Sequence, residues 1–151
     1  MRILFFADIV GRTGRNAVAK VLPEWRERYA PDVILANGEN AAGGKGITPE
    51  IVNDLIQMGI AGLTTGNHIW DKKEIYPTLD TDSRIVRPAN YSPLSPGRGY
   101  TILEVLDKRL AILSLARRVF MENADCPFRK FDEIVAQLDT PFVFVDFHGE
   151  A

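Results

Sequence analysis

Polar residues that can bind metal ions or transfer protons follow several apolar, strand-like segments of the sequence. They are Asp8; Glu39 with Asn40; Asn67 with His68; and Asp146 with His148. Carboxylate and amide oxygens combined with imidazole nitrogens form a donor set suited to Mn²⁺, Fe or Zn²⁺ rather than to thiolate chemistry. Two such cations about 3.5–4 Å apart can bind a phosphate, acidify a bridging water and offset charge on the leaving oxygen. These residue types therefore indicate phosphoryl chemistry.

Each candidate also has an ordinary structural explanation. Taken alone, Asp8 is best interpreted as a helix or turn cap, and Gly38-Glu39-Asn40 suits a turn in which asparagine tolerates the left-handed conformation. A solitary His148 is more often a buried, hydrogen-bonded histidine than a metal ligand. The functional interpretation gains weight because four strand ends carry such residues, which four independent caps do not explain.

The glycine-rich stretch from Asn37 to Thr48, NGENAAGGKGIT, superficially resembles a phosphate-binding loop. Such a loop requires a glycine six residues before its lysine and a Ser or Thr directly after it. Relative to Lys45, these two positions hold Glu39 and Gly46. The stretch is therefore not a P-loop, and we interpret Glu39 and Asn40 as functional groups in their own right.

The first half of the chain alternates between strand-like and helix-like patterns. Apolar runs predict strands at 2–7, 33–37 and 60–66, and apolar residues at helical spacing predict a helix over 14–29. Thr48 followed by Pro49 predicts the N-cap and first residue of a second helix. This alternation favours parallel strands connected by right-handed crossovers. Because the carboxyl ends of parallel strands meet at one edge of a sheet, we expect the polar residues that follow them to lie together.

The second half departs from this alternation. We expect a short helix over 71–79, a proline- and glycine-rich loop over 87–99, a hairpin of strands 100–106 and 109–115, a helix over 128–138, and a last strand from 142 that reaches Glu150. The antiparallel hairpin makes the predicted sheet mixed. Within the loop, Arg87 and Arg98 either present bidentate donors to a phosphate or hydrate a rigid loop, and both alternatives stay open.

Composition bounds the class of protein. With 151 residues and 46% hydrophobic content, the chain can fill one domain with a real core. The net charge of −2 comes without a long basic run, so we expect neither a stable nucleic-acid complex nor a membrane surface as partner. No apolar run resembles a signal peptide or a membrane span. The single cysteine, Cys126, suits a reducing compartment, and we expect a cytoplasmic protein.

Several motifs together closely resemble one branch of the calcineurin-type metallophosphoesterases, the YmdB-like family. The motifs are ADIVGRTGR, NGENAAGGKGIT, TTGNHIWDKKEI, RPANY with PGRGY, RVFM and VDFHGEA, and they extend from the first predicted strand to the last residue. GNH occurs throughout the superfamily, whereas NGENAAGGKGIT combined with GNHIWD is specific to this branch. The resemblance implies an α/β metallophosphoesterase sandwich of mixed β-sheets flanked by helices.

The resemblance also implies an activity and its site residues. It implies a two-metal phosphodiesterase, commonly with iron or manganese, that acts on small phosphoester substrates such as 2′,3′-cyclic nucleotides. Carried over by position, Glu39 bridges the two metals, Asp8 and Asn40 bind the first, and Asn67 and His148 bind the second. His68 is the implied proton donor to the leaving oxygen, a role open to a histidine that lies beside the metals without binding them. Substrate-binding residues stay unassigned.

The chain departs from the family pattern in two places. Asp8 is followed by Ile9 and Val10, where many superfamily members have Asp-x-His, and the resemblance gives that ligand position to Asn40. The family also continues beyond VDFHGEA into further strands and a Gly-Thr-His-Thr-His segment that supplies one histidine to each metal. We therefore expect residues 1–151 to be the N-terminal part of a single metallophosphoesterase domain without its C-terminal strands. Such a piece has an exposed sheet edge and marginal solubility, and its activity resides in the full-length protein.

Two other classes of function compete with a hydrolase. A non-catalytic nucleotide- or metal-binding regulatory protein would use the same strand ends to hold a ligand, and it is favoured if the natural chain ends at Ala151. A dinucleotide-binding oxidoreductase is suggested by Gly11-Arg-Thr-Gly14 after the first strand, but the full glycine fingerprint is missing. We rank the hydrolase first, and the family resemblance suggests that it forms a homo-oligomer.

Overall fold

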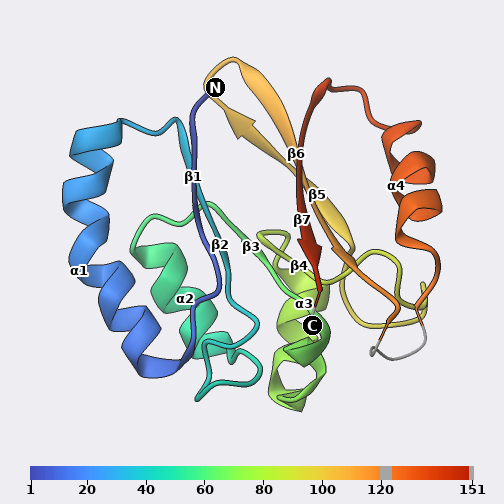
Figure 1. The fold of residues 1–151 in the computed structure, drawn as a ribbon, viewed down its shortest axis with the longest axis horizontal. Coiled ribbons are helices and arrows are strands. Elements are labelled where there is room, and N and C mark those ends of the chain that lie inside the picture. The colour runs from blue at the N-terminus through green and yellow to red at the C-terminus, as the bar shows by residue number, and fades with distance from the viewer. Residues whose placement is uncertain (120–123, 150–151) are drawn as a thin grey trace.

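The computed structural model describes residues 1–119 and 124–149 and arranges them as two β-sheets packed face to face between helices (Figure 1). Helices α1 (Gly11–Tyr29) and α2 (Pro49–Gln57) cover the outer face of the first sheet. Helix α4 (Pro127–Val135) covers the outer face of the second. The order of layers is therefore helices, sheet, sheet, helix, which is one of the few ways to bury both faces of two sheets.

Four parallel strands form the first sheet in the order in which they occur along the chain. They are β1 (Ile3–Phe6), β2 (Val33–Asn37), β3 (Gly62–Thr64) and β4 (Ile85–Val86). All five residues of β2 are buried, as expected of a continuous apolar run covered on both faces. Because the four strands run in the same direction, their carboxyl ends form one edge of the molecule.

Helical segments connect these strands. Thr48 caps α2, since its hydroxyl accepts the backbone N–H of Ile51 at 3.3 Å, a contact that stabilises a helix by about 1 kcal/mol. Between β3 and β4 lie two 3₁₀ turns, η1 (Asn67–Trp70) and η2 (Lys73–Ile75), followed by the short helix α3 (Tyr76–Thr81). The turn η1 begins directly beyond the carboxyl end of β3, and therefore presents its first residues at the same edge.

Three strands form the second sheet. They are β5 (Tyr100–Val105), β6 (Lys108–Ala116) and β7 (Phe142–His148). β5 and β6 form an antiparallel hairpin, whereas β6 and β7 are parallel. β7 is an edge strand of this sheet, and its carboxyl end lies beside the carboxyl end of the first sheet (Figure 1).

The two sheets meet through an apolar layer. Side chains alternate between the faces of each strand, so Val33 and Leu35 of β2 point toward the second sheet, while Ile34 packs among the helices. The rings of Phe5 and Phe144 meet edge to face at 4.9 Å between centroids, a geometry that adds about 0.5–1.5 kcal/mol beyond area burial. This packing fixes how the carboxyl edges of the two sheets face each other.

The predicted fold class, the parallel strands of the first half and the hairpin are confirmed. The hairpin does lie in a mixed sheet, since β6 pairs in parallel with β7, but this sheet is separate from the parallel sheet of the first half, so the expectation of a single sheet is wrong. Helix α1 begins at Gly11, earlier than predicted, and the helix expected over 71–79 is divided into η2 and α3. β4 was not predicted, since two residues leave too short an apolar run to recognise. Glu150 and part of the RVFM motif lie outside the described residues.

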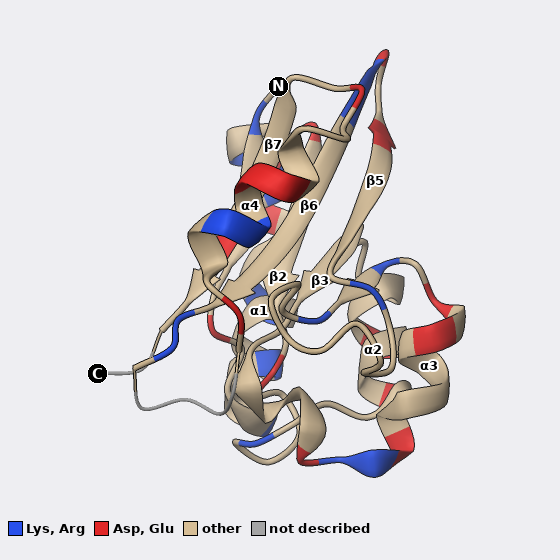
Figure 2. Ribbon diagram, turned by 90° about the vertical axis from the view of Figure 1, so that its right-hand side faces the viewer, with Lys and Arg blue, Asp and Glu red and all other residues tan. Residues whose placement is uncertain are grey.

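Charged side chains of both signs occur together on the surface. Figure 2 shows basic and acidic residues close to one another on α4 and at the turn of the β5–β6 hairpin. In the described ranges, no helix combines the length and the apolar character needed to cross a membrane.

Candidate metal centre

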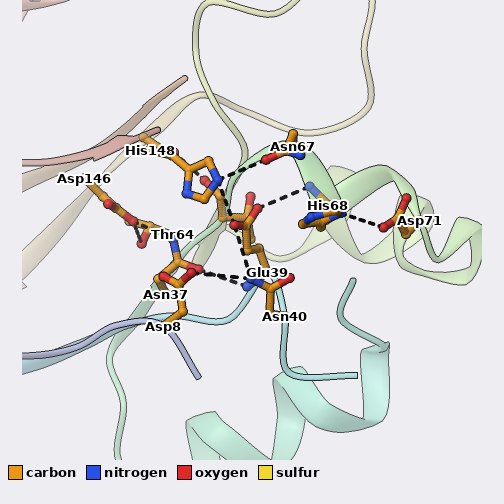
Figure 3. A network of polar contacts seen from close by, with 12 residues as sticks. Asp8, Asn37, Glu39, Asn40, Thr64, Asn67, His68, Asp71, Asp146 and His148 are labelled. Carbon is orange, nitrogen blue, oxygen red and sulfur yellow. Dashed lines mark hydrogen bonds and ion pairs between the residues drawn. The ribbon is translucent and has the colours of Figure 1, made fainter. Parts of the chain in front are cut away.

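Three of the predicted metal ligands come together at the carboxyl edges of the two sheets. Asp8 follows β1, Glu39 follows β2, and His148 ends β7. Each offers one ligand atom, and these atoms all lie within 4.8 Å of one another. The group is assembled from both sheets, because Asp8 and Glu39 come from the first and His148 from the second (Figure 3).

Glu39 is the centre of this group. The residue is 0% exposed, and its carboxylate oxygen Oε1 lies 2.9 Å from Nε2 of His148. The other oxygen, Oε2, accepts the backbone N–H of His68 at 3.2 Å. A carboxylate buried this deeply must be paired or bind a cation, because burial without compensation is costly. Its two oxygens point toward different neighbours, one toward His148 and the other toward the η1 turn.

The imidazole of His148 lies between acceptors from both sides of the site. Its Nε2 is 2.9 Å from Oδ1 of Asn67 as well as 2.9 Å from Glu39. Two oxygen acceptors facing one ring nitrogen require that nitrogen to carry the proton when no cation is present. Asn67 is the first residue of η1, just beyond β3. It is also a predicted ligand, and it contacts His148 directly.

Asn40 lies beside Asp8 and Glu39. Its amide Nδ2 donates to Oδ2 of Asp8 at 3.4 Å and to Oε1 of Glu39 at 3.5 Å, both long contacts. In the described part of the chain, its carbonyl oxygen Oδ1 is buried and has no hydrogen-bond partner. An unpaired buried oxygen costs free energy, and a hard or borderline cation would satisfy it. This orphaned oxygen, next to two carboxylates, fits a metal ion.

The site also changes the protonation of its members. Loss of hydration at this crowded edge raises the pKa of the Asp8 carboxyl, and the negative charge of Glu39 adds to that effect, although Asp8 as a whole is exposed. Burial by itself lowers the pKa of His148, but the hydrogen bond and charge of Glu39 outweigh burial and raise the pKa above its usual value. Glu39 contributes to both shifts, second to lost hydration at Asp8 and as the main raising influence at His148, and a cation would neutralise its charge.

His68 occupies a different position from the other candidates. Its Nδ1 is 2.8 Å from Oδ2 of Asp71, three residues further along the chain, and its ring lies beside the cluster rather than inside it (Figure 3). Because Asp71 accepts from Nδ1–H, it fixes the tautomer and the orientation of the ring. Asp71 was not among the residues predicted from the sequence, although its spacing from His68 in GNHIWD could have suggested the contact.

Gly66 gives the cluster its space. A Cβ atom at this position would lie 2.3 Å from Oε2 of Glu39 and 2.4 Å from Cδ2 of His148. Neither neighbour can yield without leaving the site, so only glycine allows the backbone after β3 to pass this close.

Three more polar residues lie under the cluster. Asp146 of β7 accepts from Nδ2 of Asn37 at 2.8 Å and from the hydroxyl of Thr64 at 2.5 Å. The sequence marks Asp146 as a potential metal ligand at a strand end, but it lies outside the group of converging ligand atoms; the sequence does not single out Asn37 or Thr64.

The two arginines considered for phosphate binding have other partners. Arg87 is buried, and its guanidinium donates to carbonyl oxygens of its own loop, including those of Pro88 at 2.9 Å and Pro96 at 3.2 Å. Burial lowers the pKa of Arg87. Arg98 donates to the carbonyl of Asp80 at 3.5 Å. These contacts favour the interpretation that Arg87 braces the loop.

The two packed sheets and the acidic, histidine-containing edge define the class of α/β sandwich found in metallophosphoesterases. Residues 4–151 match the model of the YmdB-like protein family, and the chain belongs to that family.

Similar proteins include enzymes and solved structures. The chain is 46% identical over 153 residues to the 2′,3′-cyclic-nucleotide 2′-phosphodiesterase of Bacillus subtilis (strain 168), with 100% of this chain and 58% of that protein covered. The crystal structure of a hypothetical protein from Thermus thermophilus matches with a TM-score of 0.92 at 40% identity, covering 100% of this chain and 59% of the other. A novel phosphatase from Mycoplasma pneumoniae matches with a TM-score of 0.92 at 27% identity, covering 100% and 56%. The chain thus spans less than two thirds of the length of these relatives.

Proposed function

We propose that this chain belongs to a metal-dependent phosphodiesterase that hydrolyses small nucleotides such as 2′,3′-cyclic nucleotides. The observation that carries the proposal is the convergence of Asp8, Glu39 and His148 within 4.8 Å, at an edge where a buried Asn40 oxygen lacks a partner. The name of the Bacillus subtilis relative supports the substrate class. Assembly into a homo-oligomer stays a prediction.

Following the family resemblance, we assign the residues to two ions, for which iron or manganese suits the mixed oxygen and nitrogen donors. In this proposal Asp8 and Asn40 would hold one ion, Asn67 and His148 would hold the other, and Glu39 would be shared by both. Two bound cations supply charge neutralisation at a phosphate and a nucleophile at neutral pH. Glu39 is suited to the bridging position because its two oxygens face His148 and the η1 turn separately.

His68 is proposed to protonate the leaving oxygen. Its Nδ1 is held by Asp71, and we assign the transferable proton to Nε2. A positioned histidine of this kind typically contributes 10²–10⁴-fold to a rate. Because His68 reaches Glu39 through its backbone N–H, the turn that orients the ring is also fixed to the proposed bridging carboxylate.

The experiment measures metal content by elemental analysis together with hydrolysis of 2′,3′-cAMP. It uses the 151-residue chain and a version extended through the downstream reading frame. Binding of close to two ions with turnover in either protein supports the proposal. Metal binding without turnover in both favours the regulatory alternative, and a folded protein with neither property would overturn the hydrolase.

A further inference from the structure

The metal centre depends on how the two sheets are held together at their carboxyl edges. Glu39 belongs to the first sheet and His148 to the second, yet their nearest atoms are 2.9 Å apart. A shift of one sheet against the other by about 1 Å would therefore separate ligands that must converge on the same ions. Contacts between the two sheets close to Glu39 and His148 must therefore set the relative position of the two edges.

The inward face of strand β7 changes from apolar to polar along the strand. Residues two apart share a face of a strand, so Phe144, Asp146 and His148 all point toward the first sheet. Phe144 packs in the apolar layer against Phe5, and His148 lies in the metal cluster. Asp146 stands between them, where the interface changes from apolar to polar.

The carboxylate of Asp146 connects the two sheets directly. Its Oδ2 accepts from Nδ2 of Asn37 on β2 at 2.8 Å and from Oγ1 of Thr64 on β3 at 2.5 Å. Charge-assisted hydrogen bonds of this kind are stronger than neutral ones. The residue therefore fixes β7 against two neighbouring strands of the other sheet, two positions before His148.

The contact with Asn37 extends to Glu39. While Nδ2 of Asn37 faces Asp146, its carbonyl oxygen Oδ1 accepts the backbone N–H of Glu39 at 3.0 Å. Asn37 is 1% exposed, so its amide has no solvent to turn toward. If the amide flipped, two donors would face each other at the Glu39 N–H, and Asp146 would face another acceptor.

We propose that Asp146 is the positioning residue of the metal centre: it joins the two sheets at this edge and, through the Asn37 amide, sets the position of Glu39 relative to His148. Asp146 is outside the group of converging ligand atoms and acts through Asn37 and Thr64. This inference rests on the proposed function only for its effect on metal binding, because the effect on Glu39 exists in the metal-free chain.

The first test follows amide hydrogen exchange of Glu39 by NMR in the metal-free 151-residue chain. In Asp146→Ala, the Asn37 amide loses its anchor, and we expect the Glu39 N–H to exchange at least about tenfold faster than in the wild type. Asp146→Asn keeps a carbonyl acceptor of the same size and should restore most of the protection. Unchanged exchange of the Glu39 N–H in Asp146→Ala would overturn the inference, whether or not the protein binds a metal ion.

A matched control separates positioning from general loosening. Phe144→Leu alters the neighbouring inward residue of β7 in the apolar layer and leaves every polar contact of Asp146 in place. It should lower the melting temperature without selective loss of protection at Glu39. If Phe144→Leu accelerates Glu39 exchange as much as Asp146→Ala does, the effect is general, and the positioning role is wrong.

The second test measures Mn²⁺ affinity by titration calorimetry. Residues that orient metal ligands typically contribute 10–100-fold to affinity, so Asp146→Ala should bind Mn²⁺ at least about tenfold more weakly, with Phe144→Leu close to wild type. Equal affinity in Asp146→Ala and the wild type would overturn the inference and leave the proposed function intact. Absence of Mn²⁺ binding by the wild-type and extended proteins would instead overturn the proposed function, and with it the metal-binding part of this inference.

Discussion

At the scale of single residues, the raised pKa of His148 has a consequence for stability. In the metal-free chain, the folded state holds this proton more tightly than the unfolded chain does, because Glu39 stabilises the charged ring. The stabilising contribution is therefore complete below the ordinary value of 6.5 and is lost as pH rises through the raised pKa. Asp8, whose pKa is also raised, acts with the same sign at lower pH.

Urea unfolding of metal-free wild type and His148→Gln across a pH series measures this effect. The wild-type advantage should be largest below pH 6.5 and should shrink as pH rises. Metal affinity should change in the opposite direction, because the ion and the proton compete for the same nitrogen. An advantage of the wild type that grows with pH would contradict the assignment.

His68 and Asp71 should affect turnover and leave metal binding unchanged. We expect His68→Asn to lower kcat by about 10²–10⁴-fold, as for other general acids, in whichever form of the protein hydrolyses 2′,3′-cAMP. Asp71→Asn should give a smaller loss, since it disturbs the orientation of the ring without removing it. Metal content is the internal control, and a parallel loss of ions in His68→Asn would make His68 a ligand instead of a proton donor.

The residue types and strand ends were enough to predict which side chains gather at the site. The partners of those side chains were harder to predict, because contacts such as His68 with Asp71 or Asp146 with Asn37 depend on rotamers and on how two sheets face each other. One signal was available. In FVFVDFH, the period of two places Asp146 on the same face as His148, which could have indicated a supporting role.

At the scale of elements, the connection between β3 and η1 has no room for a side chain larger than that of glycine at position 66. Gly66→Ala would place a methyl group 2.3 Å from Glu39 and 2.4 Å from His148, so both proposed ligands must move. We expect loss of measurable Mn²⁺ binding and a lower melting temperature. Calorimetry and thermal unfolding of the purified variant measure the two effects.

Gly43→Ala is the control for this substitution. Gly43 has a φ of +70°, and a Cβ atom added there would have no heavy atom within 4 Å, so alanine costs about 1–2 kcal/mol of backbone strain without entering the site. Metal binding should persist in Gly43→Ala. Equal losses in the two variants would show that general destabilisation, and not contact with the ligands, accounts for the result.

The loop that follows β4 is braced from inside by Arg87. Arg87→Lys keeps the charge but cannot reach several carbonyl oxygens at once, because lysine lacks the planar fork of donors. We expect a loss of about 1–3 kcal/mol in unfolding free energy, the usual cost of leaving buried polar groups unpaired, with metal affinity unchanged. Urea unfolding provides the measurement.

Arg84→Lys is the matched comparison, since Arg84 forms a surface ion pair with Asp82 and such pairs contribute about 0–1 kcal/mol. A stable Arg87→Lys protein with weakened binding of inorganic phosphate would instead revive the phosphate-binding alternative.

The sequence predicted this loop from its prolines and glycines, but it could not show that the side chain of Arg87 turns inward, since that depends on the carbonyl oxygens the folded loop presents.

At the scale of the whole molecule, ions at this edge should stabilise the docking of the two sheets. A ligand that binds only the folded state adds about 2.7 kcal/mol at a concentration about 100 times its dissociation constant. We therefore expect Mn²⁺ to raise the melting temperature of the wild type in a concentration-dependent way. His148→Gln removes the ligand supplied by the second sheet and should lose most of this shift, whereas an equal shift in that variant would place the ion elsewhere.

The proposed ligands are far apart along the chain, and their positions determine the order in which they are made during biosynthesis. Asp8 and Glu39 emerge from the ribosome early, and the first sheet can form as soon as β4 has been made, but His148 follows more than one hundred residues after Glu39. Until β7 joins its sheet, the nascent protein lacks His148, the proposed ligand that the second sheet supplies. If the proposed centre binds ions, we therefore expect loading to be complete only after β7 has been made and has joined its sheet, so the ion retained in a cell extract should come from molecules that have reached this stage.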